Sequence, residues 1–146
     1  MVDTPVVASS LEEALARIGD RWTLLLVDAL LAGPRRFGEL ADHLDGIAPN
    51  VLTKRLRQLE ADGIITAVPY SQRPLRMRYE LTAPGRDLAS ALSLLASWGS
   101  RHHGDERGDA EAAHHLSCGS TVEVRLWCPT CDRLVDDAEA DTDVTA

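Results

Sequence analysis

Apolar residues recur at helical spacing in the first quarter of the chain and predict two helices there. A stripe of Leu11, Leu15 and Ile18 follows a serine at position 9 or 10 that can cap the helix start, and Gly19 ends the stripe. Residues 21–31 are apolar on almost every side, and a glycine-proline pair stops them. The second helix is therefore expected at the centre of the core.

Two further amphipathic segments follow, separated by a short turn. Residues 37–44 place Phe37, Leu40 and Leu44 on one face, which predicts a supporting helix. From Pro49 to Ala61 the pattern predicts a second helix, seated by its leucines, because proline is tolerated at the first helical position. Its other face gathers side chains that can hydrogen-bond base edges and phosphates, namely Asn50, Thr53, Lys54, Arg57 and Gln58.

The pattern then changes to the two-residue period of strands. Residues 64–68 and 77–82 predict a β-hairpin, joined by the exposed loop PYSQRPLR. The loop and second strand carry Arg73, Arg76 and Arg78, which suit contacts with a phosphate backbone. A helical domain whose charges form only a solvated face is the alternative interpretation. The order of supporting helix, turn, basic helix and basic hairpin instead predicts a winged helix-turn-helix, with double-stranded DNA as its partner.

A last apolar helix is predicted after the hairpin. Thr82 is its expected cap, and residues 84–100 place Leu88, Leu92, Leu95 and Trp98 on one wide stripe. The helix can lie back on its own domain. Together with the helix at residues 11–18, however, it suits a two-fold homodimer interface, and paired winged domains match two DNA half-sites about one turn apart. A homodimer is the favoured interpretation.

The net charge of −8 looks unsuited to DNA binding until its distribution is counted. Residues 21–86 hold ten basic and seven acidic residues, a balance of +3, whereas residues 132–146 hold six acids and one arginine, a balance of −5. The acidity thus lies largely outside the predicted DNA-binding part. The acidic end is expected to be solvated and disordered.

The length of 146 residues suits one main domain and a small appendage. We expect a winged domain with its dimerisation helices at 9–103, a linker at 104–113, a small tail domain at 114–135 and an acidic end at 136–146. The fold class is mainly α with a small β-hairpin (α+β). The longest apolar run is interrupted by polar residues and the first residues carry no signal pattern, so a cytoplasmic protein without membrane contact is expected.

All three cysteines lie in the tail, where they form two pairs of candidate ligands. His115 and Cys118 are spaced as HxxC, and Cys128 and Cys131 as CxxC. Residues 122–127 between them alternate like a strand, so the tail predicts a small zinc ribbon with a closed, structural Cys3His site. His114 is the rival fourth ligand. A redox dithiol lacks its usual helix-start setting, and a disulfide would leave one cysteine over.

The motifs IGDRWTLLL, GPRRFGEL, IAPNVLTKRLRQLEADGII and YELTAPG are similar to those of the HxlR family of bacterial winged helix-turn-helix regulators, related in build to MarR-type regulators. The resemblance covers residues 11–99. It implies a homodimeric repressor or activator with the helix from Pro49 in the major groove. Relatives often carry an oxidant-sensing cysteine where this chain has Ser9, which argues against thiol sensing there. Ala48 stands where a capping serine is common and should weaken the helix start by roughly 1 kcal/mol.

These observations predict a sequence-specific transcriptional regulator that binds a pseudo-palindromic operator as a homodimer. The alternative is a metal- or redox-responsive sensor that uses the Cys/His tail to control DNA binding. An enzyme is not expected, because the sequence has neither a phosphate loop nor a nucleophile motif. A small aromatic effector is a further expected partner, although no polar constellation identifies it.

Overall fold

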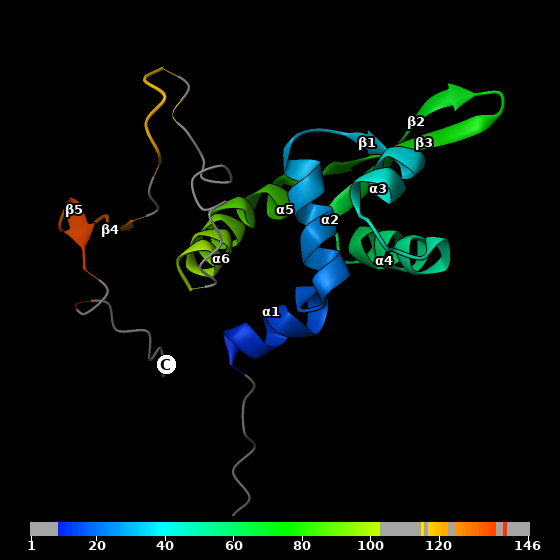
Figure 1. The fold of residues 1–146 in the computed structure, drawn as a ribbon. Helices are drawn as coiled ribbons and strands as arrows, with labels where there is room; N and C mark the ends of the chain where they lie inside the picture. The colour runs from blue at the N-terminus through cyan, green and yellow to red at the C-terminus, as the bar shows by residue number, and fades with distance from the viewer. Residues whose placement is uncertain (1–8, 103–114, 116, 123–124, 137–138, 140–146) are drawn as a thin grey trace, which may run out of the picture. The chain divides into compact units, whose positions relative to one another are not determined.

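The computed structural model describes residues 9–102, 115, 117–122, 125–136 and 139. The chain divides into two units, residues 1–92 and 93–146. The first unit contains the first five helices, the three-stranded sheet and the beginning of the sixth helix, and Figure 1 labels these elements along the chain. The predicted linker at 104–113 and most of the acidic end at 136–146 lie outside the described residues.

The first two helices agree with their sequence patterns. Helix α1 (Ser10–Ile18) is capped by Ser9, whose Oγ accepts a hydrogen bond from the Glu12 N–H at 3.2 Å. The Glu12 carboxylate accepts one in return from the Ser9 N–H at 2.7 Å, which completes a capping box. Helix α2 (Arg21–Leu31) has the predicted bounds and supplies four buried apolar residues to the core.

Helix α3 (Phe37–His43) and helix α4 (Pro49–Ala61) form the helix-turn-helix. The turn between them passes through Gly46 at φ +82°, a left-handed conformation that glycine adopts without steric cost. A second left-handed glycine, Gly63 at φ +70°, follows α4 and leads the chain into the sheet. The predicted bounds of α4 are confirmed.

A three-stranded antiparallel sheet in the order β1-β3-β2 forms the wing. Strands β2 (Ile65–Gln72) and β3 (Leu75–Leu81) are longer than predicted, so the expected loop PYSQRPLR is wrong in extent. Only Arg73 and Pro74, joined by a cis peptide bond, lie between them. Residues 69–72 extend the strand because the ladder tolerates Pro69 at an irregularity, where the register shifts between Pro69 and Ser71.

Strand β1 (Arg35–Arg36) was not predicted. It pairs with β3, placing Arg35 opposite Tyr79 and Arg36 opposite Arg78. Two residues are too few to show a two-residue period, so only the long-range pairing with β3 reveals this strand. It joins the start of α3 to the base of the hairpin.

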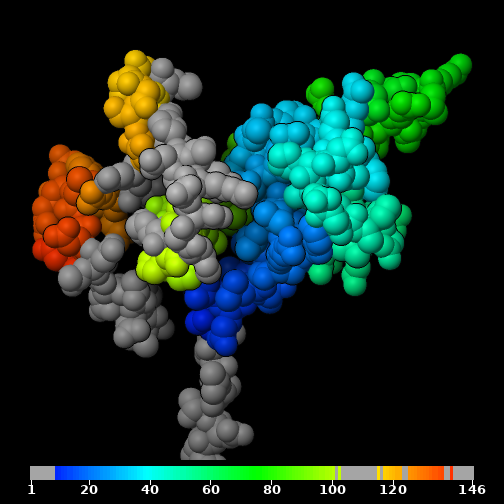
Figure 2. All heavy atoms as spheres, viewed as in Figure 1, coloured from blue at the N-terminus to red at the C-terminus, as the bar shows by residue number. Residues whose placement is uncertain are grey.

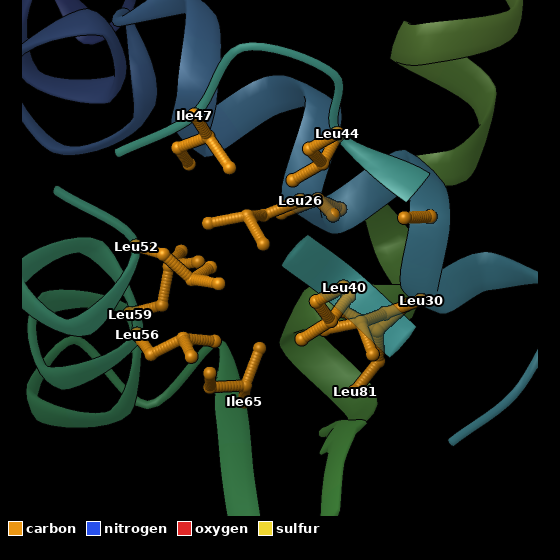
Figure 3. Packing of buried hydrophobic residues seen from close by; sticks show 12 residues of the cluster. Leu26, Leu30, Leu40, Leu44, Ile47, Leu52, Leu56, Leu59, Ile65 and Leu81 are labelled. Carbon is orange, nitrogen blue, oxygen red and sulfur yellow. The ribbon is translucent and has the colours of Figure 1, made fainter. Parts of the chain in front are cut away.

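The core of this unit lies between α2, α3, α4 and the inner ends of β2 and β3. Leu52, Leu56 and Leu59 of α4 point toward Leu26 of α2 and Ile65 of β2 (Figure 3). Each of these five residues is at most 2% exposed. Because fully burying such a side chain contributes about 1.5–3 kcal/mol, this contact fixes α4 on the domain with its opposite face outward.

The predicted helix over residues 84–100 is interrupted and is therefore wrong as a single helix. Helix α5 (Ala83–Asp87) ends at Leu88, and α6 (Ala89–His102) begins directly after it. The Leu88 N–H donates to the Gly85 carbonyl three residues back at 3.3 Å, so the turn tightens before α6 continues. Gly85 also lies so close to β2 that an added Cβ would be 2.2 Å from the Ile64 oxygen, a separation that only glycine permits.

Within the second unit, β4 (Leu126–Cys128) and β5 (Arg133–Val135) pair as a short antiparallel hairpin. Of the strand expected over residues 122–127, the structure has only residues 126 and 127 in β4, and residues 123–124 lie outside the described part. Residues 129–132 form the turn between the two strands. The hairpin is present, whereas the complete ribbon remains a prediction.

Candidate nucleic-acid interface

The outward face of α4 carries the polar side chains that the sequence singled out. Asn50, Lys54, Arg57 and Gln58 are exposed, and Thr53 is half-buried. Lys54, Arg55 and Arg57 are the charged residues between Pro49 and Arg57, so the first three turns of this helix carry positive charge alone. A face of this kind offers hydrogen-bond donors to bases and cations to phosphates.

Two side chains on this face already hydrogen-bond within the protein. The Thr53 hydroxyl donates to the Pro49 carbonyl at 2.9 Å, and the Gln58 amide donates to the Asp62 carboxylate at 3.1 Å. Both contacts join residues four apart on the helix surface, where they hold the side chains against the helix. Thr53 would have to give up this bond to donate to DNA, whereas its hydroxyl oxygen and the Gln58 carbonyl oxygen remain free to accept.

The hairpin presents a second basic surface. No acidic residue occurs between Ile65 and Tyr79 in the sequence, and Arg73, Arg76 and Arg78 are all exposed. Arg76 and Arg78 lie two residues apart on β3 and therefore on the same face of the strand. The hairpin projects from the body of its unit, as Figure 2 shows in green.

Arg36 adds a basic side chain that sequence analysis missed. It stands opposite Arg78 in the β1–β3 register, and directly opposed residues place their side chains on one face. Its guanidinium lies 4.4 Å from the centre of the Tyr70 ring on β2, within cation–π range. The only sequence signal was the Arg35–Arg36 pair itself, whose strand is too short to recognise.

Charged residues of helix α4 act on a tyrosine of the hairpin. Burial raises the pKa of Tyr79 on β3, and the nearby negative charge of Glu60 on α4 raises it further. The positive charge of Arg57, also on α4, acts in the opposite direction and lowers the pKa of Tyr79. The exposed cations of α4 and of the wing are therefore carried on the same folded unit.

A second missed residue, Arg55, pairs α4 with the start of α2. Its Nε lies 3.2 Å from Oδ1 of Asp20 in an ion pair whose angle does not satisfy a hydrogen bond. Asp20 is also the N-cap of α2 and accepts hydrogen bonds from the backbone N–H groups of Trp22 at 3.1 Å and Thr23 at 3.2 Å. The hydroxyl of the buried Thr23 donates to the other oxygen of this carboxylate. One carboxylate thus joins the start of α2 to α4.

Asp20→Ala should lower the free energy of unfolding by about 1–2 kcal/mol, because loss of a helix cap costs about 0.5–2 kcal/mol. The ion pair adds little, since both side chains are 31% exposed and solvent screens them. Asp20→Asn keeps a capping oxygen and is the matched control, expected to lose less than half as much. Urea unfolding followed by circular dichroism measures both. Equal losses in the two variants would contradict the capping role.

Ala48 is the N-cap of α4 and offers no side-chain oxygen to the first turn. The helix begins at Pro49, which needs no hydrogen bond to its nitrogen. The structure therefore confirms that the start of α4 lacks a side-chain cap, as the sequence predicted. Its effect on stability remains a prediction.

The cysteines and histidine of the tail form two separate pairs. Nδ1 of His115 lies 3.3 Å from Sγ of Cys118, and Cys131 donates hydrogen bonds to the sulfur of Cys128. Hydrogen bonds from Ser120 and then from His115 lower the pKa of Cys118 to about 7. Among the residues that the structure describes, no three His, Cys, Asp or Glu side chains come together closely enough to hold a metal ion. His114 lies outside the described residues.

Two further histidines lie on helices of the chain. His43 is exposed, and His102 is exposed and stacks on Trp98 with ring centres 5.0 Å apart. None of the helices in the described ranges is both long and apolar enough to cross a lipid bilayer.

Family comparison agrees with the winged helix-turn-helix defined by these elements. The model of the HxlR-like helix-turn-helix family matches residues 17–107, and the chain belongs to this family. An uncharacterized HTH-type transcriptional regulator of Mycobacterium tuberculosis is 41% identical over 122 residues, which cover 84% of this chain and 77% of that protein. The protein is accordingly a helix-turn-helix transcriptional regulator rather than an enzyme.

Two solved structures show the same architecture. A transcriptional regulator of the MarR family from Enterococcus faecalis is 38% identical, covers 70% of this chain and 96% of its own, and superposes with a TM-score of 0.59. The redox regulator HypR in its reduced form is 35% identical, covers 65% of this chain and 94% of its own, and gives a TM-score of 0.62. The expected MarR-like build is confirmed.

Proposed function

We propose that the protein binds a pseudo-palindromic DNA operator in the cytoplasm as a homodimer, with α4 in the major groove and the β2–β3 hairpin along the phosphate backbone. The observation that carries this proposal is the set of exposed basic side chains on two acid-free segments of one unit, one from Pro49 to Arg57 and one from Ile65 to Tyr79. Asn50 and Thr53 are assigned to base edges, and Lys54, Arg57 and Gln58 to bases or neighbouring phosphates.

The wing residues take the positioning role. Arg73, Arg76 and Arg78 are assigned to phosphates, and Arg36 joins them because it shares a sheet face with Arg78. Phosphate contacts hold the domain on the duplex without reading sequence. Specificity is therefore assigned to α4 and affinity to both surfaces.

The dimer is proposed to form through α1 and α6. None of the nine residues of α1, all of which are described, is buried, and Leu11 and Leu15 are 66% and 52% exposed. On α6, Leu95 and Trp98, three residues apart and so on one face, are 56% and 52% exposed. Helices that expose apolar side chains along one stripe gain stability when a second copy covers them.

Redox control through the N-terminal position is not part of the proposal. Ser9, which stands at the position where relatives resembling this chain often have a cysteine, instead completes the capping box of α1. Binding of a small aromatic effector stays a prediction.

Selection of bound sequences from random double-stranded oligonucleotides tests the function directly. We expect a motif with two inverted half-sites whose centres lie about one helical turn, roughly 10 base pairs, apart. The matched control is Asn50→Ala with Arg57→Ala, in which the fold is retained because both side chains are exposed. The same motif recovered with wild-type and control proteins, or no motif at all, would contradict readout by α4.

A further inference from the structure

The two ligand pairs of the tail lie in turns of the same geometry. In the first, the Gly119 N–H donates to the His115 carbonyl at 2.8 Å, and Gly119 is left-handed at φ +69°. In the second, the Asp132 N–H donates to the Cys128 carbonyl at 2.9 Å, and Asp132 is left-handed at φ +54°. Each turn therefore holds two candidate metal ligands three residues apart. Each closes with a left-handed residue directly after the second ligand.

The left-handed residue at position 132 marks the second turn as unusual. Asp132 is the one non-glycine residue in the described part of the chain with a positive φ. Aspartate is one of the few L residues that adopt this left-handed conformation readily, usually to close a turn. Here the closing hydrogen bond and the β4–β5 pairing at Cys128 and Arg133 fix it on both sides.

Hydrogen-bond donors lie next to the sulfurs in both turns. Ser120, two residues after Cys118, hydrogen-bonds that sulfur through its side chain and its backbone. Cys131 and Thr130 hydrogen-bond the sulfur of Cys128 through their backbone N–H groups. Backbone N–H groups that hydrogen-bond a sulfur are outer partners of the kind found around metal-bound sulfur, where they orient the ligand.

We propose that one zinc ion binds His115, Cys118, Cys128 and Cys131 and so draws together the turns that hold the two ligand pairs, which stand apart among the described residues of this structure. Each turn supplies two of the four tetrahedral ligands, and three sulfurs with one imidazole nitrogen are a set that zinc prefers. All three thiols are free of disulfides, and Cys118 and Cys131 are exposed, so the ligands are accessible to the ion. Four protein ligands leave no position for water, and the site is structural.

Zinc would supply the tail with the stability that its packing lacks. Leu126, Trp127 and Leu134 of the small hairpin are each about half exposed, at 49%, 54% and 55%. A hairpin of two three-residue strands without a covered apolar face is marginal in water. An ion that joins the hairpin to the first turn replaces the missing core, as in other small metal-stabilised domains.

The test uses the full-length protein purified without a histidine tag and dialysed against metal-free buffer. Elemental analysis should give one zinc per chain, and a thiol reagent should titrate the cysteines only after a strong chelator is added. Cys128→Ser and His115→Ala should each weaken zinc binding by more than the roughly 10-fold to 100-fold that loss of an outer partner costs. Ser117→Ala, a change within the first turn that removes no proposed ligand, should keep the full zinc content.

Three results would overturn the assignment. The first is a metal-free wild-type protein with three thiols that react at once. The second is a protein that keeps its zinc as His115→Ala and loses it as His114→Ala, which would replace one of the four ligands. The third is unchanged zinc content in Cys128→Ser. DNA binding by the same samples is measured separately, so failure of the zinc site and failure of the DNA-binding function are distinguished.

Discussion

Alanine in place of both Arg73 and Arg76 is expected to weaken DNA binding about 100-fold or more at low salt. A hydrogen bond to a charged group contributes about 1.5–3 kcal/mol, and two such bonds to phosphates would be lost. The slope of log affinity against log salt concentration should also fall by about one unit for each arginine, because fewer counterions are released. Fluorescence anisotropy with the selected operator, measured over a series of salt concentrations, gives both quantities.

Arg86→Ala is the matched control for this experiment. Arg86 is an exposed arginine of α5 and lies outside the proposed contact set, so its loss should change neither quantity by as much as one wing arginine. Both wing side chains are exposed and their removal leaves the core intact, so the melting temperature should stay the same. Unchanged affinity and an unchanged salt slope in the double variant would show that the hairpin does not hold phosphates.

Leu95→Asp is expected to separate the subunits of the proposed dimer. A buried, unpaired charge in an apolar interface costs about 3–5 kcal/mol, which corresponds to a dissociation constant raised by a factor on the order of 10³. Sedimentation should show dimers for the wild-type protein at micromolar concentration and monomers for the variant. Affinity for a full operator should fall toward that for a half-site, because the second domain is no longer tethered.

Leu134→Asp provides the same chemical change at a site outside the proposed interface. Leu134 lies on β5 and is 55% exposed, close to the 56% of Leu95, so the two substitutions start from similar environments. The control should remain dimeric. A monomeric wild-type protein at micromolar concentration, or monomers in both variants, would rule out an interface centred on α6.

The sequence predicted the elements whose signals are local. The bounds of α2 and α4 follow from apolar spacing and from the residues that begin and end them, and Thr82 caps the following helix as expected. The exposed polar face of α4 follows from the same period, because fixing three leucines inward turns the remaining residues outward.

Features set by distant parts of the chain could not be predicted in this way. Strand β1 exists only through its pairing with β3, and the Asp20–Arg55 ion pair joins residues that are 35 positions apart in the printed sequence. The interruption at Leu88 depends on α5 lying against Ile64, which no apolar period records. The two similar turns of the tail are recognised only from their backbone hydrogen bonds and φ angles. The sequence shows only the spacing of the candidate metal ligands.

The irregularity in β2 also bears on the behaviour of the protein in concentrated solution. Strand β2 lies at the edge of its sheet, where unpaired backbone groups can add strands from other molecules and start aggregation. Pro69 has no backbone N–H to donate, and the shift in register before Ser71 interrupts the regular row of backbone groups that a strand from another molecule would pair with. Both features reduce the tendency of this long, projecting hairpin to pair with copies of itself.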